Sequence, residues 1–361
     1  MPIHRARRPP GIEDVAIGPS IAKLALDVPL AVTAVRLARR RAFDLVHTHE
    51  EAAYIGAWIR KRFGIPHLYD VHSSLPQQLA NFGRFDWAPV VSAFTRLERW
   101  ALRNSDGAIA ICPELHDHVR AVGFDGPLAL IENTLDFDPP PDVEERARAL
   151  RGRIAAADGA VVCYTGTLEP YQGLDLLIGA APAVLARAAD TRFVIVGGNA
   201  DGIERLRRLA SGAGAAVERA FVFVPAVPPE DVRLYHAMAD VLVTCRARGT
   251  NTPLKVYQYL RAGKPIVATR IRSHTQVLDD DCAELVDPAP ASLAEGLLRV
   301  ILDAERARGL ARRAGALAEA RYGEATYVAR LQGLLAEMGL GRSAPAPAAP
   351  VLAPAAQGGR P

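Results

Sequence analysis

The segment RGTNTPLKVYQYLRAGKPIVAT (248–269) joins a polar loop to a predicted helix, and its residue types suit the binding of an anion. The helix is expected to begin near Leu254, between the apolar runs DVLVTC and PIVAT, which indicate strands. The first N–H groups of a helix have no partner inside it, so they can donate to an anion in front of the helix. Lys255 would add a positive charge. The loop and the start of the helix can therefore hold a diphosphate.

An ordinary structural role explains the same spacing. In this interpretation Thr252 caps the helix and Lys255 lies in solvent, with no ligand in front of the loop. The spacing alone leaves both interpretations open.

Polar residues also stand at the ends of two predicted strands in the first half of the chain. His72 ends PHLYDVH, and Asp70 lies two residues earlier, on the same side of an extended strand, where it could orient the imidazole. His49 and Glu50 end the run DLVHTHE and point to the same rim, where they could contact a second substrate. Each of these groups could also be a polar strand end that the backbone satisfies.

Short apolar runs that suit β-strands alternate with helical patterns, which is typical of parallel sheets with helices on both faces. The stretch DFDPPPDVEER (136–146) interrupts the alternation, and we predict that it forms neither strand nor helix. The strand runs are DLVHTH, PHLYDVH, GAIAIC and LALIEN before this stretch, and VVCYTG, RFVIVGG, AFVFVPAV, DVLVTC and PIVAT after it. The sequence thus predicts an α/β protein of two Rossmann-like, doubly wound domains facing a cleft, with ligands at the carboxyl ends of the strands.

These patterns place the domain boundaries. The first domain covers residues 1–138, a linker covers 139–158, and the second domain covers 159–321. A last amphipathic helix follows at 322–340. The Pro/Ala-rich tail at 341–361 should be disordered, because it cannot bury a core.

Composition argues against several classes of protein. A net charge of +3 over 361 residues, without a Lys/Arg-rich run beside aromatic residues, gives no support to nucleic-acid binding. No apolar run reaches the ~18 residues of a membrane span, and the basic N-terminus lacks the apolar core of a signal peptide. The four scattered cysteines suggest small buried residues in a reducing compartment. Asp279, Asp280 and Asp281 are expected to be solvated rather than to bind a metal.

The segment 248–269 resembles the donor-binding segment of the family 4 retaining glycosyltransferases. One branch of that family carries Pro-x-Lys-x-x-Glu-Tyr and then an AGKP turn; this chain has Pro253, Lys255, Gln258 and Tyr259 before AGKP. Further matches are YTGTLEPYQGLDLL (164–177), RFVIVGG (192–198) and HTQVLDDDCAELVDP (274–288). In the first half, FDLVHTHEE, YDVHSSLPQ and GAIAICPEL match more loosely.

The resemblance implies the GT-B fold and a nucleoside-diphosphate sugar as co-substrate, with neither a metal nor a further cofactor. It places His72 near the reacting sugar, and we expect His72 to act in catalysis with Asp70, which would orient it. From their place at strand ends, we expect His49, Glu50 and the long loop 73–85 on the acceptor side. The resemblance also implies that the last helix packs back on the first domain. The residues implied in donor binding are Gly166, Thr167, Arg248, Asn251, Thr252, Pro253, Leu254, Lys255 and Gln258.

Four positions depart from the usual pattern of this family. They are Thr250 and Gln258, which replace two glutamates, and Thr167 and Gln172, which replace an arginine and a lysine that clamp the diphosphate. Gln258 can still exchange hydrogen bonds with a ribose, but without charge assistance. Lys255, the loop amides and Arg248 would then carry more of the phosphate binding.

The leading hypothesis is a cytoplasmic hexosyltransferase for a cell-envelope glycan or lipid-linked acceptor, such as lipopolysaccharide, with peripheral contact to the inner membrane. The alternatives are a degenerate protein that binds a nucleotide sugar or a partner without turnover, and a nucleotide-sugar epimerase. The predicted helix 21–41, apolar on one side and Arg-rich at its end, could lie on an anionic membrane. Pro29 is expected to interrupt it, and we favour a helix that simply covers the sheet.

Members of this family normally begin with a strand, a Gly-rich turn and a helix, and we find no such pattern before Ile21. We therefore expect an incomplete first domain that lacks two βα units of about 30 residues each. A start codon assigned too late explains this better than a natural truncation does. An open reading frame upstream of Met1 would test the idea.

Overall fold

The computed structural model describes residues 2–10, 21–74, 88–132, 141–156 and 158–341. The chain divides into two compact units, which we describe separately. Unit 1 consists of Met1–Ile109, Gly123–Ile131 and Tyr327–Pro361, and unit 2 consists of Ala110–Val122 and Glu132–Thr326. The predicted first domain, 1–138, had included the stretch Ala110–Val122, which groups with unit 2.

Unit 1 contains a four-stranded sheet in the order β1-β2-β3-β4. All five residues of β2 are buried, as expected for an inner strand that is covered on both faces. β1 pairs with β2 in parallel, and the register places His49 opposite Asp70. The carboxyl ends of these two strands therefore lie side by side. The strands are β1 (Val46–His49), β2 (His67–Val71), β3 (Gly107–Ala110) and β4 (Leu128–Leu130).

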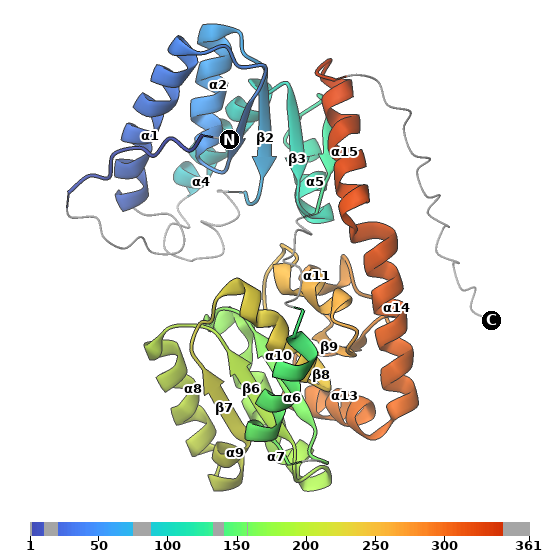
Figure 1. Ribbon diagram of the computed structural model, residues 1–361. Coiled ribbons are helices and arrows are strands. Elements are labelled where there is room, and N and C mark those ends of the chain that lie inside the picture. Colours follow the sequence, from blue (N-terminus) through green and yellow to red (C-terminus); the bar gives the residue numbers. More distant parts are fainter. Residues whose placement is uncertain (1, 11–20, 75–87, 133–140, 157, 342–361) are drawn as a thin grey trace. The chain divides into compact units, whose positions relative to one another are not determined.

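The last helix of the chain contributes to the core of unit 1. Leu334 is buried in a small apolar cluster with Leu68, Ile109 and Ile131. Arg330 donates a hydrogen bond of 3.2 Å to a carbonyl of β4. The described helices that contribute to this unit are α1 (Ile21–Arg40), α2 (Ala52–Phe63), α4 (Ala88–Arg103) and α15 (Glu324–Glu337) (Figure 1).

Unit 2 contains a six-stranded parallel sheet in the order β10-β9-β8-β5-β6-β7. The chain adds β6 and β7 on one side of β5 and then returns to place β8 on the other side. This reversal makes the pair β5 and β8 the switch point, where doubly wound sheets bind ligands at the carboxyl ends of the strands. The strands are β5 (Val161–Thr165), β6 (Arg192–Val196), β7 (Phe221–Val224), β8 (Val241–Thr244), β9 (Ile266–Thr269) and β10 (Glu284–Val286).

Helices cover both faces of this sheet (Figure 1). One face packs an apolar cluster that includes Leu177 and Phe193, and the other packs a cluster that includes Leu242 and Tyr259. The helices of unit 2 are α5 (Pro113–Ala121), α6 (Val143–Ile154), α7 (Leu174–Arg187), α8 (Ala200–Gly212), α9 (Ala215–Ala220), α10 (Val232–Met238), α11 (Leu254–Arg261), α12 (Arg272–Thr275), α13 (Pro290–Leu302) and α14 (Ala304–Tyr322).

The segment predicted as a linker contains a helix. α6 spans Val143–Ile154, so the prediction that the residues after the proline run cannot be helical is wrong. Glu144 and Glu145 lie in the first turn of α6, and Arg151 and Arg153 lie in its last turn, which is the charge order that a helix dipole favours. The helix begins as soon as the prolines end. Residues 133–140 lie outside the described residues.

Pro29 does not interrupt the N-terminal helix, contrary to the prediction. α1 continues through it, and Thr33 Oγ1 donates to the carbonyl of Pro29 at 2.8 Å. The predicted single helix at 322–340 is instead the end of α14 followed by α15, with a break at Gly323. The tail after Gly341 lies outside the described residues.

Two predictions about composition can be compared with the structure. All four cysteines are free and buried, as predicted. Among the residues that the structure describes, no helix is long and apolar enough to cross a membrane.

Candidate functional site

The carboxyl ends of β5 and β8 approach each other so closely that glycine is required between them. Gly173 has a φ of 69°, and a Cβ atom there would lie 2.0 Å from the carbonyl oxygen of Cys245. Gly166, directly after β5, has a φ of 139° and is exposed. Few side chains tolerate either conformation. The two loops therefore meet through backbone at the switch point.

Lys255 lies in the first turn of α11 and is buried at this point. Its Nζ is 3.6 Å from the centre of the Tyr164 ring and 3.5 Å from Oε1 of Gln172. A Cβ atom on Gly166 would lie 2.7 Å from this Nζ. Burial lowers the pKa of Lys255 well below the ordinary value for lysine. The interpretation with Lys255 in solvent is therefore wrong.

The partners of this buried ammonium are a ring face and an amide oxygen. Among the described residues, no carboxylate lies within ion-pair distance of Lys255 Nζ. A buried charge without an opposite charge is costly unless a ligand supplies one. The position of Lys255 at the start of α11 thus favours an anionic ligand at the end of β5.

Arg246 is a second, half-buried cation near this point, and it was not predicted from the sequence. Its Nη1 donates to the carbonyl of Asn251 at 2.8 Å, and its guanidinium lies 5.1 Å from the centre of the Tyr171 ring. Burial lowers its pKa. Arg248, which was predicted instead, is exposed. The signal in the sequence is position, because Arg246 follows the buried run of β8 after a single residue.

The loop before α11 is held by hydrogen bonds from outside the helix. Gln276 Nε2 donates to the carbonyl of Thr250 at 2.5 Å, while Oε1 of Gln276 accepts from the backbone of Glu114 at 2.8 Å. The residue at the cap position of α11 is Pro253, and no side chain caps the helix. Thr252 therefore does not have the capping role that the structural interpretation gave it.

The other predicted donor residues surround this loop. Thr167 is exposed after β5, and its Oγ1 accepts from Nε2 of Gln172 at 3.1 Å. Thr252 and Pro253 are buried, whereas Leu254 is exposed. Gln258 is half-buried and lies four residues after Leu254, on the same accessible side of α11. The predicted residues of unit 2 thus lie on two loops, one after β5 and one before α11, and on the first turns of α11.

Two buried histidines support the ends of the strands from beneath. His236 Nε2 lies 3.1 Å from Oγ1 of Thr165, and burial lowers its pKa to about 3. His274 Nε2 lies 3.0 Å from Oγ1 of Thr244, and burial lowers its pKa to about 4. Both imidazoles are neutral at physiological pH. They position β5 and β8 without adding charge.

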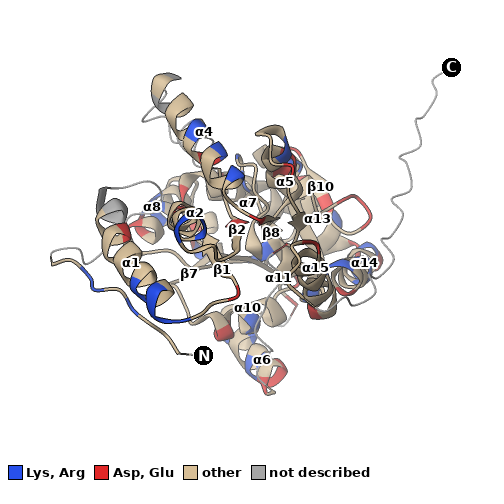
Figure 2. Cartoon of the chain, turned by 90° about the horizontal axis from the view of Figure 1, so that it is seen from above, with Lys and Arg blue, Asp and Glu red and all other residues tan. Residues whose placement is uncertain are grey.

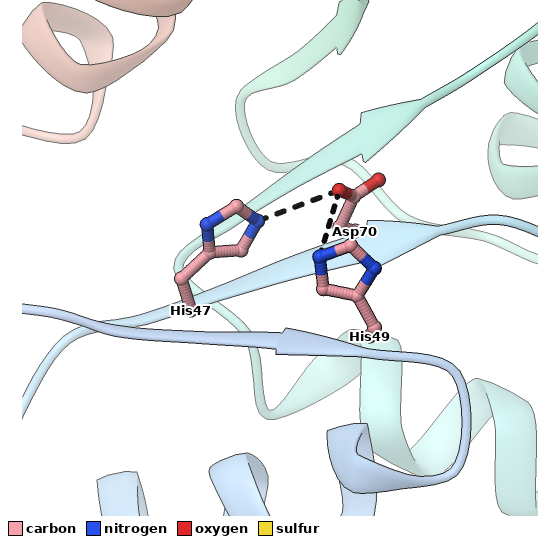
Figure 3. A group of neighbouring side chains, drawn as sticks. All are labelled: His47, His49 and Asp70. Atoms are coloured by element: carbon pink, nitrogen blue, oxygen red, sulfur yellow. Dashed lines mark ion pairs between the residues drawn. The ribbon is translucent and has the colours of Figure 1, made fainter. Parts of the chain in front are cut away.

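In unit 1, four polar side chains gather on one face of the sheet. His47 and His49 are two residues apart on β1, and Asp70 of β2 lies opposite His49 in the register (Figure 3). His72 follows Asp70 after one residue. Period-2 alternation places all four on the same face. We call His47, His49, Asp70 and His72 the histidine cluster; His47 was not predicted, although it has the same spacing from His49 as Asp70 has from His72.

One carboxylate oxygen is the centre of the histidine cluster. Oδ2 of Asp70 lies 3.2 Å from Nε2 of His72, 3.4 Å from Nε2 of His49 and 3.6 Å from Nε2 of His47. Burial acts to raise the pKa of Asp70, but hydrogen bonds with His47 and His72 hold it well below its ordinary value. The hydrogen bond with Asp70 raises the pKa of His72, whereas burial lowers that of His49. Asp70 is thus ionised and surrounded by imidazoles.

Glu50 has a strained backbone directly after β1. Its φ is 45°, and among the described residues every other positive φ belongs to a glycine. Its carbonyl accepts a hydrogen bond from Ala53 at the start of α2. Such strain at the end of a strand is frequent at functional sites. The turn lets the chain leave β1 immediately after His49.

A separate hydrogen-bond network fixes the other face of the same strands. Thr48 Oγ1 lies 2.6 Å from Nε2 of His67, and Ser105 Oγ lies 3.1 Å from its Nδ1. Burial lowers the pKa of His67 to about 4. A Cβ atom on Gly56 would lie 2.2 Å from this imidazole, so α2 can pack here only with glycine. The strands that carry the histidine cluster are therefore held rigidly.

The acidic run at 279–281 has structural partners. Asp280 forms an ion pair with Arg270, with Oδ1 2.6 Å from Nη2, and Oδ1 of Asp279 accepts from the backbone of Asp281. The one group of residues in the described part of the chain whose ligand atoms lie close enough for a metal is His47, His49 and Asp70. The predicted acceptor loop beyond Ser74 lies outside the described residues.

Two family models match the chain. The model described as Glycosyltransferase Family 4 matches residues 4–138, and the one described as Glycosyl transferases group 1 matches residues 159–303. The chain belongs to glycosyltransferase family 4. The match covers both the strands of the histidine cluster and the loop before α11.

Curated relatives of this family 4 chain are transferases with different acceptors. A GDP-mannose-dependent alpha-(1-6)-phosphatidylinositol monomannoside mannosyltransferase of Mycolicibacterium smegmatis is 34% identical over 56% of this chain and 54% of the relative. A D-inositol 3-phosphate glycosyltransferase of Acidothermus cellulolyticus is 26% identical over 74% of this chain and 62% of the relative. The chain thus spans between half and two thirds of the length of these relatives.

Solved structures of glycosyltransferases have the same GT-B fold. Sucrose-phosphate synthase of Thermosynechococcus elongatus has a TM-score of 0.73 at 20% identity and covers 93% of this chain and 82% of its own. HepE of Anabaena, in complex with UDP and glucose, has a TM-score of 0.71 at 20% identity and covers 89% of this chain and 84% of its own. The predicted α/β architecture of two Rossmann-like, doubly wound units is confirmed.

Family membership gives a meaning to the contact between Lys255 and Gln172. Gln172 stands where the family pattern described above has a phosphate-clamping lysine. Here Oε1 of Gln172 lies 3.5 Å from Nζ of Lys255, a lysine that the family pattern also has. Lys255 is thus the cation next to the position at which this chain lacks the second lysine.

Proposed function

We propose that this chain is a retaining glycosyltransferase that transfers a hexose from a nucleoside-diphosphate sugar to a glycan or lipid-linked acceptor of the cell envelope. The observation that carries the proposal is the buried ammonium of Lys255 at the switch point of unit 2, which has an amide and an aromatic ring as its neighbours. A donor diphosphate in front of α11 would supply the missing negative charge.

The names of related proteins support a nucleotide-sugar donor. The mannosyltransferase relative is named as dependent on GDP-mannose, and HepE of Anabaena has been solved with UDP, with UDP-glucose and with UDP and glucose. Both kinds of donor share the diphosphate that Lys255 would contact. Gln258, half-buried on α11, would exchange hydrogen bonds with the donor ribose.

The proposed reaction breaks the bond between the anomeric carbon and the diphosphate and forms a bond from that carbon to an acceptor oxygen, whose proton passes to the departing diphosphate. Lys255 and the free N–H groups of α11 stabilise the charge that develops on the diphosphate. In unit 1, Asp70 fixes the imidazole of His72, which donates to a sugar hydroxyl. His49 and Glu50 take part in holding the acceptor.

We also propose that the protein works in the cytoplasm with peripheral contact to the membrane. Val28, Leu30 and Val32 on α1 are exposed. Arg39 and Arg40 lie in the last turn of the same helix, and Figure 2 shows basic residues toward one end of α1. Exposed apolar side chains beside arginines suit an anionic lipid surface. Such a surface would bring the protein to a lipid-linked acceptor.

The test is a screen of nucleotide sugars by thermal shift, followed by product analysis. A donor that binds the folded state raises the melting temperature by mass action, and Lys255→Met should abolish this shift while Lys264→Met keeps it. Mass spectrometry of the reaction with the donor found would then distinguish a glycosylated acceptor from an epimerised donor. A shift without any product would indicate a degenerate binding protein, and no shift with any donor would refute the proposal.

A further inference from the structure

The pairing between β5 and β8 stops before the two strands reach their carboxyl ends. β5 pairs with β8 as far as Cys163 and Leu242, whereas it pairs with β6 as far as Thr165. The two chains meet again in the loops that follow, where the backbone N–H of Ala247 donates to the carbonyl of Tyr171 at 3.0 Å. Among the described residues, no strand pairing joins β5 and β8 between these two points.

The hydroxyl of Tyr259 lies at this interruption. It accepts a hydrogen bond of 2.9 Å from the backbone N–H of Thr165, the last residue of β5, and it donates to the carbonyl of Val243 on β8 at 3.5 Å. Tyr259 belongs to α11 and is fully buried, as is Val243. One phenol hydroxyl from a helix thus satisfies backbone groups of two strands, which would otherwise be buried without partners.

A buried histidine contacts the same threonine and the same ring. His236 Nε2 lies 3.1 Å from Oγ1 of Thr165, and that oxygen lies 3.3 Å from the hydroxyl of Tyr259. The rings of His236 and Tyr259 meet edge to face, with centroids 5.2 Å apart at an angle of 90°. Burial raises the pKa of Tyr259, so its hydroxyl keeps its proton. The tyrosine is therefore held in one orientation as a neutral donor and acceptor.

Tyr259 and Lys255 lie four residues apart on α11, so they project from the same side of the helix. The hydroxyl of Tyr259 ties the second turn of α11 to the end of β5. Lys255, in the first turn, places its ammonium over the Tyr164 ring and beside Gly166, which follows β5 directly. The position of this ammonium relative to β5 therefore depends on the point at which Tyr259 is anchored.

We propose that Tyr259 is a positioning residue of the donor site, which acts through Lys255 rather than by touching the donor. Its hydroxyl keeps the ends of β5 and β8 apart and fixes α11 so that the ammonium of Lys255 faces the donor diphosphate. A cation that is held in place before binding needs little rearrangement, which raises affinity. This inference rests on the proposed function, because that proposal assigns Lys255 to the diphosphate.

The first test is a double-mutant cycle on nucleotide affinity. The probes are GDP and UDP, the nucleoside diphosphates of GDP-mannose and of the HepE complex, titrated by calorimetry. Tyr259→Phe should weaken binding by about 3- to 10-fold, as for one lost hydrogen bond. In the background of Lys255→Met, the same substitution should change Kd by less than about twofold, since the group through which it acts is gone.

Tyr235→Phe is the matched control for this cycle. Tyr235 is a half-buried tyrosine of unit 2 that packs on the same apolar cluster as Tyr259, and its substitution should leave Kd unchanged. An equal loss from Tyr259→Phe in both backgrounds would indicate a general loosening of unit 2 and would overturn the proposal, as would parent-like binding by Tyr259→Phe. If Lys255→Met binds as the parent does, or neither nucleotide binds the parent, the proposed function fails instead.

Amide hydrogen exchange tests the anchoring by Tyr259 without any nucleotide. In Tyr259→Phe, the loops 166–173 and 246–253 should exchange about 5- to 10-fold faster than in the parent, because the strand ends that carry them are no longer held. α13 should exchange at the parent rate and serves as the internal reference, and Tyr235→Phe should leave both loops unchanged. Parent-like exchange of both loops in Tyr259→Phe would refute the role of its hydroxyl.

Discussion

At the scale of single residues, Lys255 places binding and stability in conflict. Its buried charge has a function only when an anion is present, so Lys255→Met should stabilise the free protein and weaken donor binding. The lost charge-assisted contact is worth about 1.5–3 kcal/mol, or roughly a 10- to 150-fold rise in Kd. Urea unfolding and titration with the donor measure the two effects. Lys264→Met, in the turn after α11, should change donor affinity little.

The same lysine should give stability a particular dependence on pH. Its pKa in the folded protein is far below the ordinary value of 10.5, so between these two values the unfolded chain binds more protons than the folded one. The free energy of unfolding must then rise with pH in that range. The difference in unfolding free energy between Lys255→Met and the parent should shrink as pH rises from neutral toward 10.5. A difference that stays constant would show that folding does not lower the pKa of Lys255.

A double variant tests whether a lysine at position 172 can take over the role of Lys255. In Gln172→Lys/Lys255→Met, the lysine stands at the other position at which the family pattern has one, and its ammonium should reach the same diphosphate. Donor affinity should recover to within about tenfold of the parent, whereas Lys255→Met alone stays weak. Gln172→Lys alone should lose stability, because it places two ammonium groups together. Equal affinities for the double variant and Lys255→Met would contradict a shared phosphate position.

The site residues that belong to a sequence motif could be predicted from the sequence. The site residues that depend on how separate loops pack together could not. Lys255, Asp70 and His72 follow from spacing and resemblance. Arg246 and the approach of Lys255 to Gln172 depend on how two loops meet after β5 and β8, which no local pattern specifies. His47 illustrates an intermediate case, since its alternation with His49 was visible but required the register with Asp70 to acquire meaning.

At the scale of the elements, the loop after β5 depends on a single glycine. Gly173→Ala should destabilise unit 2 by about 2–4 kcal/mol, because left-handed backbone is costly for alanine and the new Cβ would collide with the Cys245 carbonyl. Chemical denaturation measures this effect. Gly212→Ala is the matched control: no atom lies within 4 Å of its Cβ position at the end of α8, and alanine should be neutral or stabilising there. Equal stability of the two variants would show that the loops do not pack as described.

Most strands were predictable because their apolar runs are continuous, as buried parallel strands require. The secondary-structure predictions were wrong where a proline was given more weight than the helix-favouring residues around it. Pro29 is accommodated within α1, and the proline run at 139–141 ends just before α6, whose charge pattern favours a helix. A local rule about one residue type thus failed where the surrounding sequence had stronger helical character.

At the scale of the whole molecule, unit 1 is assembled from separate stretches of the chain, and Leu334 belongs to its core. Leu334→Ala should lower the stability of unit 1 by about 2–5 kcal/mol. All three tryptophans, Trp58, Trp87 and Trp100, precede Ile109, so tryptophan fluorescence reports on unit 1. In Leu334→Ala, the midpoint of the tryptophan fluorescence transition in urea should therefore fall. Leu302→Ala, which truncates an exposed side chain of unit 2, should leave the tryptophan transition unchanged. A tryptophan transition that Leu334→Ala leaves in place would contradict the packing of α15 on this core.

The central pair of strands in unit 2 also has a consequence for the time course of folding. β5 can pair with β6 soon after both are synthesised, but its other neighbour, β8, arrives much later: Val161 donates its backbone N–H to Asp240, 79 residues further along the chain. Closing so long a loop costs more entropy than a local contact and slows the step that requires it. A nascent chain released or stalled before β8 would hold half of a sheet with one unpaired apolar edge, and that edge is the one most exposed to aggregation.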